Sequence, residues 1–146
     1  MQRVKFIKLN SSAVTPSYGS EYAAGADLYA CIQQDKLTFS PNETKIVGTG
    51  IAMQIPEGLV GLIYARSGIA TKRGLAPANK VGVIDSDYRG EIMVALHNHS
   101  DKVQEIQNGE RIAQIVLTPF IAAQFELTDK LDSTERGEGG FGSTGR

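Results

Sequence analysis

Hydrophobic positions along this chain alternate with polar ones more often than they recur at helical spacing. Val4, Phe6, Ile7 and Leu9 open the pattern, and a long β-branched run covers residues 44–55. Further segments of the same type cover residues 37–39, 59–64, 91–97 and 111–120. Because successive side chains on a strand point to opposite faces, the pattern predicts a chain built from half-buried β-strands.

Turn-forming residues separate these strands, namely Pro41-Asn42, Pro56-Glu57-Gly58 and Asn108-Gly109. Strands of this length and spacing predict an all-β fold, a jelly-roll-like distorted antiparallel barrel. Only residues 67–73 have the character of a helix. This helix would begin at Ser67, whose hydroxyl can cap backbone amides, and end at Gly74.

The apolar periodicity stops after Leu131, where residues 132–146 run DSTERGEGGFGSTGR. Five of the last eleven residues are glycine, and only Phe141 among them is large and apolar. Such a segment cannot bury enough apolar surface to fold alone. We expect one β domain over residues 1–131 and a mobile C-terminal arm of the same domain over residues 132–146.

Composition limits the classes of function. With 15 Lys and Arg against 16 Asp and Glu, the chain lacks the broad basic field of a nucleic-acid-binding protein. Its lone Cys31 excludes an internal disulfide and a thiolate zinc cage, which favours a reducing compartment. No apolar run suits a signal peptide or a membrane span, so we expect a cytoplasmic protein, or a nuclear one if its source has a nucleus.

Residues 79–91 (NKVGVIDSDYRGE) combine a tight turn with several chemically capable side chains. Turn chemistry alone explains an isolated Asp-x-Asp. The additional tyrosine, asparagine and acids favour a functional site. His97 and His99 would share one face of a strand, but a metal pair there lacks a third nitrogen or sulfur ligand. The abundance of carboxylates makes magnesium the better candidate metal.

Two further segments suit phosphate. Arg66, Ser67 and Gly68 place a guanidinium and a hydroxyl at the start of the short helix, where free amides favour an anion. An ordinary helix cap beside a solvated arginine is an equally good account of that triplet. Residues 137–144 have the glycine spacing of a phosphate loop, with Ser143 in place of the Walker A lysine. A disordered chain end is the alternative there.

Five strings in order resemble the motifs of the trimeric deoxyuridine triphosphatases (dUTPases). They are AGADLYA at 24–30, ARSGIA at 65–70, GVIDSDYRGEI at 82–92, GERIAQIVL at 109–117 and RGEGGFGSTG at 136–145. One departure is Ala65, because the family usually has proline before the Arg-Ser-Gly. Proline would preset the backbone that enters the helix.

The resemblance implies a jelly-roll subunit in a homotrimer, with active sites at the subunit interfaces. It implies Mg²⁺-dependent hydrolysis of dUTP to dUMP and diphosphate, which keeps uracil out of DNA and supplies dUMP for dTMP synthesis. Neither nucleic acid nor membrane is expected as a partner.

The resemblance also implies residue roles. Asp85 would activate the attacking water, Gln114 would contact the α-phosphate or that water, and Asp27 would hold magnesium through water. Residues expected to bind the phosphates are Arg66, Ser67, Gly68, Arg136, Gly142, Ser143 and Thr144. Those expected to select base and sugar are Asn79, Gly82, Val83, Ile84, Tyr88 and Phe141. Arg89 and Glu91 are expected to be structural and joined by a salt bridge.

Three alternatives compete with this interpretation. A dCTP deaminase shares the fold and some motifs, but the tyrosine in residues 82–92 and the aromatic tail favour the triphosphatase. A non-catalytic nucleotide sensor would need most of the same residues, although it would not need Asp85. A structural jelly-roll subunit gives no reason for Arg, Asp and Gly clustered at separate loops.

Overall fold

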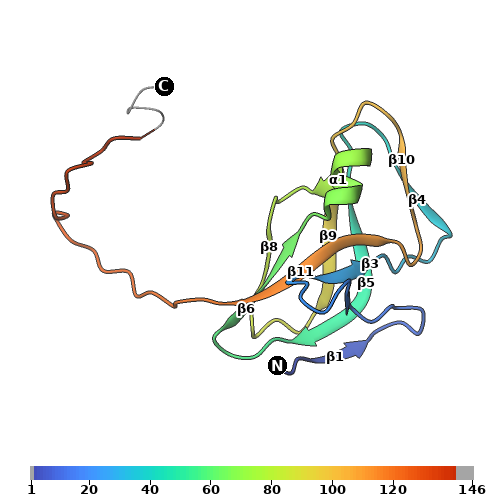
Figure 1. Ribbon diagram of the computed structural model, residues 1–146, viewed down its shortest axis with the longest axis horizontal. Helices are drawn as coiled ribbons and strands as arrows, with labels where there is room; N and C mark the ends of the chain where they lie inside the picture. The colour runs from blue at the N-terminus through green and yellow to red at the C-terminus, as the bar shows by residue number, and fades with distance from the viewer. Residues whose placement is uncertain (1, 141–146) are drawn as a thin grey trace.

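The computed structural model describes residues 2–140, which form short strands and a single helix (Figure 1). In chain order they are β1 Lys5–Lys8, β2 Ser17–Tyr18, β3 Ala26–Tyr29, β4 Lys36–Phe39, β5 Thr44–Gln54, β6 Leu59–Tyr64, α1 Ser67–Arg73, β7 Leu75–Pro77, β8 Gly82–Ile84, β9 Glu91–Asn98, β10 Gln104–Gln107 and β11 Arg111–Pro119.

The strands form two main sheets and one small one, and all the pairings are antiparallel. One main sheet has the order β1-β5-β9-β7, and the other has the order β2-β3-β11-β6-β8. Strands β10 and β4 form the small sheet. This arrangement confirms the predicted all-β, jelly-roll-like fold.

Alternation of side chains builds the core between the sheets. Along β9, Ile92, Val94 and Leu96 are buried, whereas Met93 between them is exposed. Burial of a side chain of this size contributes about 1.5–3 kcal/mol relative to exposure. The longer predicted strands are therefore present, and β6 has the predicted bounds. The pattern does not predict β2, β3, β7, β8 and β10, which have two to four residues each. Among strands this short, only β1 and β4 coincide with predicted segments.

The helix has the predicted bounds, but the expected cap is wrong. The N-cap residue is Arg66, which is extended (φ −90°, ψ 132°) and makes no side-chain cap bond. Ser67 is already the first helical residue, so its hydroxyl is not in the cap position. Gly74 ends the helix as predicted, in the left-handed conformation at φ 68° that an L-residue adopts at a steric cost.

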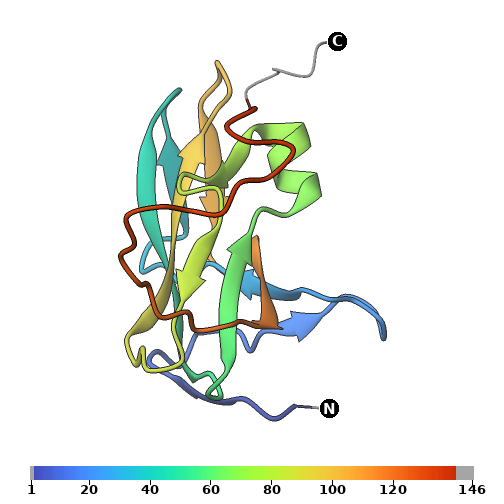
Figure 2. The same ribbon diagram turned by 90° about the vertical axis from the view of Figure 1, so that its left-hand side faces the viewer.

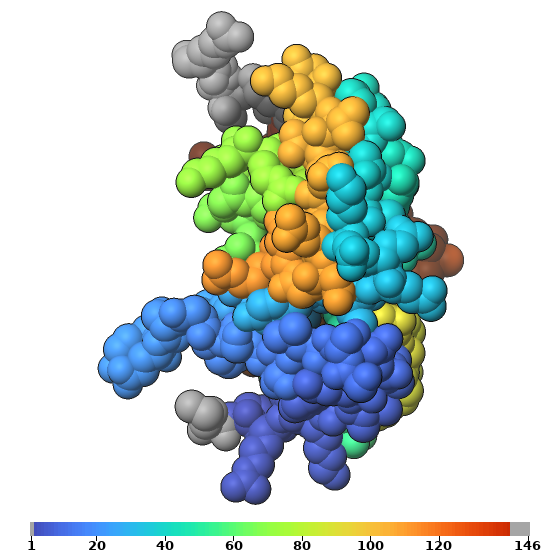
Figure 3. All heavy atoms as spheres, turned by 90° about the vertical axis from the view of Figure 1, so that its right-hand side faces the viewer, coloured from blue at the N-terminus to red at the C-terminus, as the bar shows by residue number. Residues whose placement is uncertain are grey.

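The last strand of the described residues ends at Pro119, and residues 121–140 extend away from the body without helix or strand (Figure 1). Their large apolar side chains, Ile121, Phe125, Leu127 and Leu131, are exposed. At the other end of the chain, the β2–β3 hairpin projects from the body (Figures 2 and 3).

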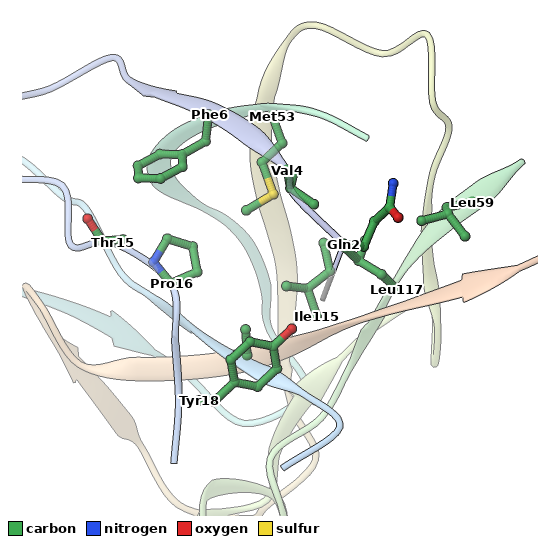
Figure 4. Close-up of a pocket in the computed structure, with 11 residues that line it drawn as sticks. Gln2, Val4, Phe6, Thr15, Pro16, Tyr18, Met53, Leu59, Ile115 and Leu117 are labelled. Carbon is green, nitrogen blue, oxygen red and sulfur yellow. The ribbon is translucent and has the colours of Figure 1, made fainter. Parts of the chain in front are cut away.

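An apolar pocket of about 500 Å³ lies beneath the N-terminal segment. Figure 4 shows Phe6 and Met53 on one side of it, with Tyr18 and Ile115 on the other. It is lined by Gln2, Val4, Phe6, Thr15, Pro16, Tyr18, Ala26, Met53, Leu59, Ile115 and Leu117. No carboxylate, cationic or imidazole side chain belongs to this set, and the Tyr18 phenol is its one ionisable group. Among residues 2–140, no helix is long and apolar enough to cross a membrane.

Candidate active site

Three neighbouring strands bring one group of predicted residues together. Gln114 of β11 lies opposite Asp27 of β3 on one side and opposite Tyr64 of β6 on the other. The chain continues from Tyr64 directly into Arg66 and Ser67. Residues distant in sequence therefore meet at one end of this sheet.

These residues line a pocket of about 190 Å³, which we call the arginine pocket. Its lining residues are Gly19, Ala23, Gly25, Asp27, Arg66, Ser67, Arg111 and Gln114. Arg66 Nε donates to Asp27 Oδ1 at 2.6 Å, and the Asp27 side chain is only 10% exposed. Arg66 is thus held by a charge-assisted bond. The alternative interpretation, in which Arg66 is a solvated arginine beside an ordinary helix cap, is therefore wrong about this side chain. Its two Nη groups make no bond within the described chain, so they can bind an anion.

Gln114 is also fixed in the arginine pocket. Its Nε2 donates to the carbonyl of Ala65 at 2.9 Å, a bond that the usual proline could accept equally well. A Cβ placed on Gly25 would lie 2.4 Å from Gln114 Oε1 and 3.0 Å from its Cδ. Gly25 therefore leaves the space that the Gln114 amide occupies.

We expect Gly25→Ala to lower catalytic efficiency about tenfold, because the added methyl displaces the Gln114 amide, which the resemblance places against the substrate. The matched control is Gly19→Ala in the same hairpin, where nothing lies within 4 Å of the new Cβ. Steady-state kinetics of both variants, with melting curves to confirm folding, measure the difference. Equal activity of the two variants would contradict the expected role of Gln114.

A second group of predicted residues surrounds the turn after β8. Tyr88 N donates to Asp85 O at 3.2 Å, which closes the turn, and Tyr88 Oη donates to the carbonyl of Glu91 at 3.0 Å. The Asp85 carboxylate is exposed to solvent in this chain. It lines a pocket of about 200 Å³ with Val83, Ile84, Tyr88, Glu91 and Met93, which we call the aspartate pocket.

Arg89 and Glu91 support this turn through backbone contacts. Arg89 Nη1 donates to the carbonyls of Ser86 and Tyr88 at 2.7 and 2.9 Å. Glu91 Oε1 accepts from Gly50 N at 2.7 Å, where β5 bulges away from β9. Their structural role is as expected, but the salt bridge between them is wrong. Among residues 2–140, each bonds to backbone groups instead.

The turn that precedes β8, residues 79–82, is equally tight. Lys80 has a positive φ of 65°, and Val81 N donates to the Asn79 carbonyl at 2.7 Å. A Cβ on Gly82 would lie 3.2 Å from Ile63 Cβ and 3.4 Å from Asn79 Nδ2. The small residue at 82 therefore lets Asn79 and the backbone pack closely.

The two pockets lie toward opposite ends of β6. Ile84 pairs with Gly61, and Asp85 continues toward the start of that strand, whereas Arg66 follows its other end. At about 3.3 Å per residue, the two groups are separated by roughly 10 Å or more along the strand. The pockets share no lining residue. One chain thus carries both groups but does not place Asp85 beside Arg66.

The remaining predicted residues lie elsewhere. Gly68 is exposed on α1, and Arg136 Nε donates to the Gly139 carbonyl at 2.9 Å in the tail. Phe141, Gly142, Ser143 and Thr144 lie outside the described residues.

His97 and His99 do meet, with ring centroids 4.3 Å apart, and His97 Nδ1 bonds to Thr44 Oγ1 at 2.8 Å. Burial, followed by the positive charges of His97 and Lys80, lowers the pKa of His99.

The family model for dUTPase matches residues 11–145 of this chain. Deoxyuridine 5'-triphosphate nucleotidohydrolase of Desulfitobacterium hafniense (strain DSM 10664 / DCB-2) is 46% identical over 144 residues, which cover 98% of this chain and 95% of that protein. The enzyme of the same name from Nautilia profundicola is also 46% identical, with 99% of both chains covered. The chain belongs to the dUTPase family. It is a dUTP diphosphatase, which hydrolyses dUTP to dUMP and diphosphate.

A solved dUTPase structure has the same fold as this chain. The dUTPase of Staphylococcus bacteriophage 80alpha, with the dUTP analogue dUPNHPP, has a TM-score of 0.89 to this chain at 28% identity, and the match covers 100% of both chains. Sequence reasoning missed a charged residue of the arginine pocket, Arg111. Its place in the pocket depends on an irregularity of β11, which no sequence pattern indicates.

Proposed function

We propose that this dUTP diphosphatase is a homotrimer whose active sites form between subunits, where the aspartate pocket of one chain meets the arginine pocket of another. The separation of Asp85 from Arg66 along β6 supports this most directly. A dUTPase needs both groups at one substrate, and folding within one chain keeps them apart. A second copy supplies the missing half.

Exposed apolar surface supports the same assembly. Ile46 is 67% and Met93 is 46% exposed on the face of the β5–β9 sheet that points away from the core. The apolar pocket beside Tyr18 is a further uncovered surface (Figure 4). Apolar patches of this kind are typical of surfaces that other protein chains cover.

The reaction is an in-line displacement at the α-phosphorus. Asp85 accepts a proton from a water molecule as the water oxygen forms a bond to the α-phosphorus. The bond from the α-phosphorus to the bridging oxygen breaks, and that oxygen leaves with diphosphate. Arg66, Ser67 and Gln114 donate to the phosphate oxygens and stabilise the charge that moves onto the leaving group.

Asp27 is the residue that would hold magnesium, through water. Within residues 2–140, no three His, Cys, Asp or Glu side chains cluster to hold a metal ion. The Asp27 carboxylate has about four lone-pair directions, of which two are used by arginines. The remaining directions suit a cation that keeps its waters and takes its direct ligands from the phosphates. When bound, magnesium neutralises part of the triphosphate charge.

The turn before β8 would select the base, and the turn after β8 would select the sugar. Backbone groups of residues 79–84, with the Asn79 amide, would pair with uracil and exclude the methyl group of thymine. Cytosine would leave their donors and acceptors unmatched, which can cost about 10,000-fold in specificity. Tyr88, held by its bond to the Glu91 carbonyl, would pack against the deoxyribose and exclude a 2'-hydroxyl.

The arm formed by residues 132–146 would close over the substrate from a third direction. Arg136, Gly142, Ser143 and Thr144 would bind the γ-phosphate, and Phe141 would stack on uracil. Closure of the arm excludes water, which strengthens every electrostatic contact in the site.

Diphosphate release from dUTP, dTTP, dCTP and UTP, each with magnesium and with a chelator, tests this proposal. We expect release from dUTP only, and its loss on chelation. Release from dTTP at a comparable rate would contradict the assigned role of the turn before β8. Release from UTP at a comparable rate would contradict the assigned role of Tyr88. Full activity in the presence of the chelator would show that the reaction does not need magnesium.

A further inference from the structure

Arg111 occupies the arginine pocket without a part in the reaction described above. Its Nη1 donates to Asp27 Oδ2 at 3.3 Å, while Arg66 Nε holds the other oxygen of the same carboxylate. The Arg111 side chain is 53% exposed, against 10% for Asp27. The guanidinium therefore stands at the mouth of the pocket, with Nε and Nη2 free of bonds within the described chain.

A β-bulge brings Arg111 to this face. Gln114 pairs with Asp27 and Ala113 with Leu28, but Arg111 pairs with Tyr29, so Ile112 is an extra residue on β11. Three positions apart on a regular strand, Arg111 and Gln114 would point to opposite faces. The extra residue places both on the face of Asp27, and Ile112 and Ala113 are buried in succession. Bulges commonly re-aim a side chain beside an active site.

The charges in the pocket favour an anion over an internal ion pair. Two guanidinium groups face a single carboxylate, which leaves an excess of one positive charge. The carboxylate lies between them, so each arginine is oriented and neither is neutralised completely. Ser67 and Gln114 line the same pocket and add uncharged polar groups. A multiply charged phosphate chain is the ligand class that fits this set.

We propose that Arg111 is a second arginine of the phosphate site, which binds the β- and γ-phosphates and so holds the diphosphate leaving group. Asp27 is the positioning residue that fixes the two guanidinium groups side by side. This proposal rests on the proposed function in one respect, that the arginine pocket receives the phosphate chain.

Calorimetric binding of inorganic diphosphate and of dUMP, both with magnesium, tests Arg111 independently of turnover. For Arg111→Gln we expect diphosphate to bind about tenfold more weakly and dUMP to bind unchanged, because dUMP lacks the β- and γ-phosphates. Arg111→Lys keeps the charge but loses the fork of donors, so it should recover only part of the affinity. Arg3→Gln makes the same chemical change at an exposed residue outside the pocket.

Unchanged diphosphate affinity in Arg111→Gln would overturn the proposal. An equal loss of dUMP and diphosphate affinity would also overturn it, since that pattern indicates general damage to the site. Arg66→Gln in the same assay separates the two failures, because unchanged diphosphate affinity in that variant as well would mean that the arginine pocket does not receive the phosphate chain. Melting temperatures of the variants should match that of the unaltered protein, since the replaced side chain is half-exposed.

Discussion

Replacement of Asp85 by asparagine should lower kcat for dUTP by about 10²- to 10⁴-fold, which is the usual range for loss of a general base. Asparagine keeps the size of the side chain but cannot accept the proton from the attacking water. The exposed carboxylate makes no bond to the fold through its side chain among the described residues, so stability should be preserved. Single-turnover kinetics and calorimetric binding of dUMP separate chemistry from binding.

Asp87→Asn is the matched control for this variant. It makes the same change two residues away in the same turn, at a carboxylate that does not line the aspartate pocket. We expect it to keep most of the activity. Near-normal turnover in Asp85→Asn would remove Asp85 from the mechanism, and equal loss in both variants would point to damage of the turn.

Removal of residues 136–146 should lower kcat/KM about 10²-fold or more. The truncated chain loses Arg136 and the expected phosphate ligands Gly142, Ser143 and Thr144. It keeps every strand of the body, because the last strand among residues 2–140 ends at Pro119. Melting curves and light scattering should therefore be unchanged, while diphosphate release falls.

Lys130→Gln serves as the control for the truncation. It removes one cation from the same tail, upstream of the proposed arm. We expect full activity from it. A truncated enzyme that works as well as the whole chain would show that the arm does not close the site.

The long strands and the helix could be predicted from sequence, because each has enough residues for its pattern to be distinctive. β9 buries Ile92, Val94 and Leu96 in strict alternation, and α1 ends at a glycine with positive φ. Most of the short strands could not be predicted; β8, for example, has only three residues and begins with glycine. Their pairing partners, not their own sequence, make them strands.

The sequence motifs predict which residues belong to the site, but they do not predict how those residues come together. Arg66, Ser67, Asp27 and Gln114 do line one pocket, but their convergence depends on the pairing of β3, β11 and β6. The bond from Glu91 to Gly50 and the place of Arg111 each depend on a bulge. Bulges shift side chains between faces and leave no periodic signal in the sequence.

The Ser67 cap shows how a tertiary contact overrides a local preference. Serine is a favoured N-cap residue, and its position before the apolar residues of α1 suggested that role. In the structure, the ion pair of Arg66 with Asp27 accompanies an extended Arg66 backbone, and the helix begins at Ser67, one residue earlier than a serine cap requires.

Active-site complementation tests most directly the claim that each site joins Asp85 of one chain to Arg66 of another. Asp85→Asn and Arg66→Gln chains should each be nearly inactive alone. Unfolded together and refolded in equal amounts, they should regain about a quarter of the normal activity, because each mixed trimer has one interface with both residues intact. Recovered activity in a species of three times the 15.7 kDa chain mass is the result we predict. No recovery, in mixed trimers isolated by a tag on one chain, would contradict the shared site.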